Sequence, residues 1–120
     1  MPKYILLIHT DPSKTADVSA DEWAAMHQDY ATYTQAMVDS GAFVAGDPLE
    51  GVETAKSVTK GGVVTDGPFA DVTEHLGGYY VVDVASIDDA VKLAAGLPGV
   101  DRGLDRIEVR PIAPFDIDGR

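Results

Sequence analysis

The sequence contains no cysteine, which excludes a disulfide framework, a thiolate nucleophile and a Cys-ligated metal. It also lacks a long apolar run, because the opening segment is apolar only from Tyr4 to Ile8 before His9 and Asp11 interrupt it. A membrane span needs about 20 apolar residues, and a signal peptide needs a basic start followed by a longer apolar stretch. We therefore expect a cytoplasmic protein with neither segment.

Positive charge is scarce. Nine Lys and Arg residues face 20 Asp and Glu residues, so the net charge is −11 at pH 7. Nucleic acids and anionic membrane surfaces are both bound by clustered Lys and Arg. We expect neither as a partner, which leaves a small-molecule ligand or a second copy of the chain.

The chain is 120 residues long, with 45% apolar and 24% charged residues. This composition is typical of a soluble globular protein, and the length suits one domain spanning residues 1–120. A chain of this size buries roughly two-thirds of the surface that its unfolded form exposes, which is enough for a core.

A long amphipathic helix is predicted from Ser19 to Ser40. Ser19 and Glu22 form a capping box, in which each side chain satisfies a free amide of the first turn. Gly41 supplies the stop signal. The face turned toward the rest of the protein recurs at spacings of three and four residues: Trp23, Met26, His27, Tyr30, Tyr33, Thr34 and Met37.

Together with this helix, the other predicted elements give the order β-α-β-β-α-β, which is typical of a ferredoxin-like α+β sandwich. Ser86 with Asp89 begins a second helix that ends at Pro98-Gly99. Residues 11–14 form a turn. Apolar or alternating segments predict strands over residues 3–9, 42–45, 56–65 (a strand or a hairpin), 78–84 and 106–112.

Such a sheet, with both helices on one face, leaves its other face uncovered. Strands rich in Val, Ile, Leu and Tyr would then expose a large apolar patch, which monomers rarely tolerate. Twofold pairing of two sheets face to face removes the patch. We therefore expect a homodimer.

The segment VTDGPFADVTEHLGGYYVV, residues 64–82, resembles the DGPF signature of YCII-related proteins. The flanking segments KYILLIH, MHQDY, SGAFVAGDPL, SIDDAVKLAAGLPG and IEVRPI extend the resemblance over residues 3–112. It implies a single YCII-related domain that forms a dimeric α+β barrel with a pocket beside the sheet, similar to muconolactone-isomerase-like proteins. The family's reaction is not established.

His27 is the first candidate catalytic residue. It lies on the helix face that should turn toward the sheet, where an imidazole is shielded from bulk water and suited to proton transfer near neutral pH. The resemblance places it at the histidine proposed as catalytic in YCII proteins. The alternative is a histidine at the edge of the core, bonded to a backbone carbonyl.

In that family an aspartate before a proline, after the second helix, is proposed to orient the histidine. This sequence has Leu97 before Pro98, so the aspartate is missing. Asp66 and Asp101 are the candidate replacements.

Asp66 opens the DGPF turn and has two interpretations. Its carboxylate can cap the turn, in which the proline is expected to push Gly67 toward extended geometry. Alternatively, the turn places a catalytic carboxylate at the mouth of the pocket, opposite His27.

Three further residues are candidates for substrate binding. Tyr79 and Tyr80 point to opposite faces of their strand, so either can line the pocket with a hydroxyl. Arg110 in the last strand can hold an anionic substrate or form a surface salt bridge.

The sequence has no His-x-His or His-Glu-x-x-His pair, no P-loop, no dinucleotide-binding glycine motif and no nucleophile elbow. We expect neither a metal nor a cofactor. Two functions remain open. One is an enzyme performing isomerase- or lyase-like acid–base chemistry on a small carbonyl compound, with His27 moving the proton. The other is a non-catalytic small-molecule-binding or regulatory homodimer that uses the same pocket.

Overall fold

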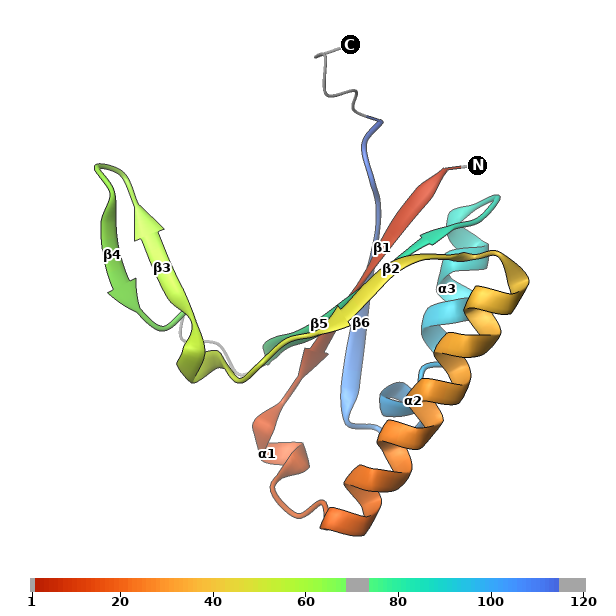
Figure 1. Cartoon of the computed structure of the whole chain (residues 1–120), viewed down its shortest axis with the longest axis horizontal. Helices are drawn as coiled ribbons and strands as arrows, with labels where there is room; N and C mark the ends of the chain where they lie inside the picture. The colour runs from red at the N-terminus through yellow and green to blue at the C-terminus, as the bar shows by residue number, and fades with distance from the viewer. Residues whose placement is uncertain (1, 69–73, 115–120) are drawn as a thin grey trace.

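The structure is a computed structural model that describes residues 2–68 and 74–114. Four antiparallel strands form the main sheet in the order β2-β5-β1-β6 (Figure 1). They are β1 (Lys3–Thr10), β2 (Phe43–Pro48), β5 (His75–Asp83) and β6 (Asp105–Pro111). The fold is therefore mixed α+β, as the sequence predicted. Within the described residues, no helix is both long enough and apolar enough to cross a membrane.

Helix α2 (Ala20–Ser40) begins and ends at the predicted signals. The Ser19 hydroxyl accepts a hydrogen bond from the Glu22 amide at 3.1 Å, and it also lies 3.2 Å from the Glu22 carboxylate. Gly41 ends the helix with a φ of +83°, a left-handed conformation that favours glycine.

Helix α3 (Ile87–Ala95) begins at the predicted Ser86 cap. The prediction for its end was wrong in one respect. The helix ends at Gly96, and Pro98 starts a further helical turn, α4 (Pro98–Asp101). Proline fits the first position of a helix because an amide hydrogen, which proline lacks, would have no partner within the helix there.

Another short helix occupies the predicted turn after β1. Helix α1 (Pro12–Thr15) is capped by Asp11, whose carboxylate accepts a hydrogen bond from the Ser13 amide at 2.9 Å. The polar Asp-Pro-Ser segment that signals a turn is also a good helix start.

Helices α2 and α3 both cover one face of the main sheet (Figure 1), and the core lies between these layers. Leu6 on β1, Val82 on β5 and Leu97 before α4 are fully buried, and Met37 on α2 packs with them. Leu97 therefore stands at a buried position, where a carboxylate would lose its hydration.

The opposite face of the main sheet is uncovered by any described helix. Ile5 and Leu7 on β1 and Val81 on β5 alternate with the buried residues, so they point away from the helices and remain half-exposed. We call this surface the open sheet face. It corresponds to the uncovered apolar face that the sequence predicted.

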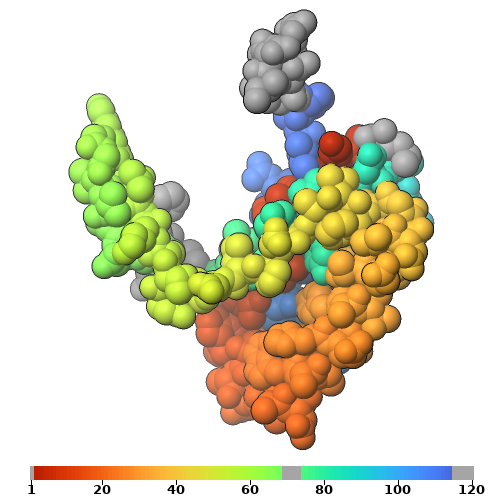
Figure 2. Space-filling view, in the orientation of Figure 1, coloured from red at the N-terminus to blue at the C-terminus, as the bar shows by residue number. Residues whose placement is uncertain are grey.

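Residues 56–66 form a hairpin that is separate from the main sheet. Strands β3 (Lys56–Thr59) and β4 (Val63–Asp66) pair only with each other among the described strands. Figures 1 and 2 show this hairpin, in green, projecting from the body of the molecule. Its valines Val58, Val63 and Val64 are each more than half exposed.

The DGPF turn closes the base of this hairpin. Gly67 does not adopt extended geometry as predicted but has a φ of +94°, in the region that favours glycine. Its amide donates to the Ala55 carbonyl at 2.7 Å, and its carbonyl accepts from the buried Ser57 hydroxyl at 2.6 Å. The positive φ explains the glycine, and the two bonds hold the turn in this conformation. Phe69, the last residue of the motif, lies outside the described residues.

Candidate functional site

A cavity of about 650 Å³ lies between α2 and the covered face of the main sheet. In Figure 2 the surface is hollowed between α2, in orange, and the red-orange end of β1 with α1. This volume falls in the range of about 300–1,000 Å³ that is typical of small-molecule sites. The polar and aromatic side chains that line it include Thr10, Trp23, His27, Tyr30, Thr34, Tyr80 and Asp105.

His27 lines the cavity, but its side chain is exposed rather than shielded from water as predicted. Met26 is the buried residue of this turn, at 5% exposure, which places His27 at the edge of the packed face. The ring centroids of His27 and Trp23 are 6.0 Å apart, with the planes tilted by 39°. The imidazole therefore stands beside an aromatic wall and is open to solvent.

Asp105 forms the polar floor of the cavity. Its carboxylate accepts hydrogen bonds from the Thr10 hydroxyl at 2.7 Å and from the Tyr30 hydroxyl at 3.0 Å. The Tyr30 oxygen in turn accepts from the amide of buried Gly99 at 3.2 Å. We call these four residues the Asp105 cluster. It joins β1, α2, α4 and β6.

Tyr30 is held in its protonated form. Burial raises the pKa of its hydroxyl well above the usual range, and the negative charge of Asp105 raises it further. Tyr30 therefore acts as a hydrogen-bond donor to Asp105 and not as a proton shuttle near neutral pH.

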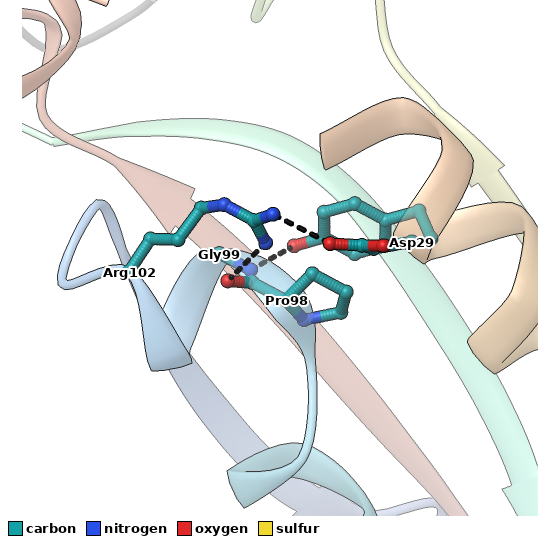
Figure 3. Close-up of polar contacts among 5 residues, drawn as sticks. Asp29, Pro98, Gly99 and Arg102 are labelled. Atoms are coloured by element: carbon teal, nitrogen blue, oxygen red, sulfur yellow. Dashed lines mark hydrogen bonds and ion pairs between the residues drawn. The ribbon is translucent and has the colours of Figure 1, made fainter. Parts of the chain in front are cut away.

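A second set of polar contacts joins helix α4 to α2 (Figure 3). The Arg102 guanidinium pairs with Asp29 at 2.5 Å and donates to the Pro98 carbonyl at 3.3 Å. The Gly99 amide reaches Tyr30 from the same turn. These bonds hold the chain that leads into β6, and so they position Asp105.

The wall opposite α2 is formed by β2 and β5. The hydroxyls of Tyr80 and Thr34 lie 2.7 Å apart, and the Tyr80 ring packs edge-to-face on Phe43 with centroids 6.2 Å apart. On the other face of these strands, the Tyr79 hydroxyl donates to the Asp47 carboxylate at 2.9 Å. This hydrogen bond raises the pKa of Tyr79.

The structure brings together only some of the predicted site residues. The side chains of His27 and Tyr80 line the cavity, whereas Tyr79 borders it but its side chain lies on the open sheet face, opposite Leu7. Asp66 does not line it: it is exposed at the end of β4, where it pairs with Lys56 at 2.5 Å. Arg110 does not line it either, because it is exposed on β6 opposite Ile5, on the open sheet face.

Asp101, the other candidate partner for His27, is exposed on α4 and does not line the cavity. The carboxylate that the cavity does contain belongs to Asp105, which the sequence reasoning missed. Thr10 and Asp105 lie one residue beyond the predicted first and last strands, and the pairing of β1 with β6 in the structure places them opposite each other. Among the described residues, no three His, Asp or Glu side chains lie together as metal ligands.

The model of the YCII-related domain matches residues 2–116. The chain belongs to the YCII-related family. It is 32% identical to the uncharacterized protein R00369 of Rhizobium meliloti (strain 1021) over 115 residues, covering 93% of each chain.

A solved structure is similar as well. It is 5-chloro-2-hydroxyhydroquinone dehydrochlorinase from Burkholderia phenoliruptrix AC1100 in complex with 2,5-dihydroxybenzoquinone. It superposes with a TM-score of 0.56 over 98% of this chain and 99% of that one, at 16% identity. At this identity the likeness concerns the fold.

Proposed function

We propose that this YCII-related protein binds a small cyclic carbonyl or hydroxylated ring compound in the cavity and catalyses proton transfer on it. The observation that carries the proposal is the combination, in one cavity of about 650 Å³, of the His27 imidazole and the Asp105 carboxylate with aromatic walls. The dehydrochlorinase with the similar fold holds 2,5-dihydroxybenzoquinone, a compound of this class. That supports the choice of ligand by analogy.

In the proposed reaction, His27 removes a proton from a ring carbon next to the carbonyl, and the electron pair moves onto the carbonyl oxygen. The Thr34 and Tyr80 hydroxyls form one hydrogen bond between them, so one of the two protons remains to stabilise that oxygen. His27 then returns the proton to another atom, which gives isomerisation, or the pair expels a leaving group, which gives elimination.

The test is hydrogen–deuterium exchange at the ring carbons of 1,2,4-trihydroxybenzene, followed by proton NMR in D2O without oxygen. The wild-type protein should speed the exchange over buffer. His27→Gln should remove most of that acceleration, since a positioned base contributes about 10²- to 10⁴-fold. His75→Gln is the matched control, because His75 does not line the cavity. Equal rates for His27→Gln and wild type would refute the role of His27.

One observation favours the alternative, a non-catalytic binding module. Among the described residues, His27 is exposed and makes a ring contact with Trp23 but no side-chain hydrogen bond that would orient its imidazole. A catalytic histidine is usually oriented by such a bond. Under this alternative, the ring compound binds in the cavity and exchange stays at the buffer rate.

We also infer that two copies associate through the open sheet face into a dimeric barrel, each copy contributing a ferredoxin-like sheet. The half-exposed apolar strands and the exposed valines of the hairpin support this, because monomers rarely leave such surfaces bare. Light scattering after size exclusion should give about twice the chain mass of 12.7 kDa. Leu7→Lys, on the open sheet face, should give a monomer. Val91→Lys is the control and should remain dimeric, because the Val91 side chain is exposed on α3. A monomeric wild-type protein would refute the inference.

A further inference from the structure

The charges that face the cavity are unbalanced. One carboxylate, that of Asp105, faces it, because the Asp47 carboxylate bonds to Tyr79 on the other face of the sheet. In the part of the chain that the structure describes, no Lys or Arg lines the cavity. Among the described lining residues, His27 is the one basic side chain. A site for carboxylates or phosphates normally presents Arg, Lys or several free amides to the ligand.

The arginines next to Asp105 in the sequence have other partners. Arg102 pairs with Asp29 and the Pro98 carbonyl, and Arg106 pairs with Glu74 at 2.8 Å. Asp105 is instead satisfied by two neutral hydroxyls, which leave its negative charge in place.

Asp105 can still accept hydrogen bonds from a ligand. Each of its oxygens receives one hydroxyl, whereas a carboxylate offers about four lone-pair positions. A ligand hydroxyl would therefore add a charge-assisted hydrogen bond, while a ligand carboxylate would meet a fixed like charge in a partly dehydrated space.

From this arrangement, and resting on the function proposed above, we propose that the cavity selects uncharged hydroxylated rings over the same rings carrying an acid group, and that Asp105 sets this selectivity. A ligand hydroxyl donates to Asp105 while the ring packs beside Trp23.

The experiment compares hydroquinone with 2,5-dihydroxybenzoate, which is the same ring with one carboxylate added. Trp23 is the only tryptophan of the chain and lines the cavity, so its indole N–H peak in ¹⁵N-labelled protein reports binding directly. Titrations at about pH 8, where an ordinary imidazole is neutral, give both dissociation constants. We expect hydroquinone to bind at least about tenfold more tightly than 2,5-dihydroxybenzoate, a difference of about 1.4 kcal/mol.

Asp105→Asn should reduce this ratio at least about threefold, mainly by improving binding of 2,5-dihydroxybenzoate. Asp101→Asn is the matched control: it changes the net charge equally, but Asp101 lies outside the cavity, so the ratio should stay. If Asp105→Asn does not fold, the wild type is titrated with 2,5-dihydroxybenzamide, an uncharged ring of similar size, which should bind about as tightly as hydroquinone; binding as weak as that of 2,5-dihydroxybenzoate would overturn the charge argument.

Equal or tighter binding of 2,5-dihydroxybenzoate by the wild type would overturn the proposed selectivity while leaving ring binding intact. A ratio in Asp105→Asn equal to that in Asp101→Asn would overturn the role of Asp105. If neither probe moved the Trp23 peak at millimolar concentration, the proposed function would fail together with this inference.

Discussion

Replacing Tyr30 by Phe tests whether the Asp105 cluster holds the floor of the cavity. The substitution removes one hydroxyl that donates to the Asp105 carboxylate at 3.0 Å and accepts from the Gly99 amide at 3.2 Å. A hydrogen bond to a charged group contributes about 1.5–3 kcal/mol, and the buried amide left without its partner adds to the loss. We expect Tyr30→Phe to lower the free energy of unfolding by about 2–3 kcal/mol.

Tyr33→Phe is the matched comparison on the same helix. The Tyr33 hydroxyl donates at 2.7 Å to the Leu93 carbonyl, a neutral acceptor, so its loss should cost about 0.5–1.5 kcal/mol. Urea unfolding followed by circular dichroism measures both variants, and Tyr30→Phe should shift the midpoint by about 1–2 M. If Tyr30→Phe were no more destabilising than Tyr33→Phe, the charge-assisted network would not stabilise this site.

The wild-type free energy of unfolding should fall as pH rises above about 10. Above that pH the unfolded chain releases the Tyr30 proton, whereas burial raises the pKa of Tyr30 in the folded protein and keeps the proton bound. If urea unfolding showed the same decrease with pH in Tyr30→Phe as in the wild type, this explanation would be contradicted. Because Leu97 is fully buried, Leu97→Ala should lower the free energy of unfolding by about 2–5 kcal/mol, and Leu97→Asp should lower it by more. A Leu97→Asp protein as stable as the wild type would contradict this and show that the position tolerates a carboxylate. Gly67→Ala should destabilise the base of the hairpin by about 1–2 kcal/mol, because φ is +94°, and unchanged amide exchange at the Gly67–Ala55 bond would refute that expectation.

Local patterns in the sequence predicted most of the fold. The capping box at Ser19, the stop at Gly41 and the cap at Ser86 each depend on residues adjacent in the chain, so they were visible without tertiary information. The separate placement of the hairpin was not, because strand pairing between distant segments leaves no local periodic signal. The turn at Pro98 was misjudged because proline both ends helices and begins them.

The site was predicted less well than the fold. Helical spacing placed His27 on the correct side of α2 but not at its depth, since residues 26 and 27 differ by about 100° around the axis. Asp66 was chosen for its motif, yet the hairpin carries it to a surface pair with Lys56. Asp105 reaches the cavity only through the pairing of β1 with β6, which a search for short motifs does not reveal.

The most direct test of the central claim is to map where hydroquinone binds, using backbone and indole shifts of ¹⁵N-labelled protein during a titration. We predict that the perturbed residues cluster around the cavity, with the largest changes at Thr10, Trp23 and Tyr80. Perturbations confined to the open sheet face, around Ile5 and Arg110, would contradict the assignment of the cavity as the functional site.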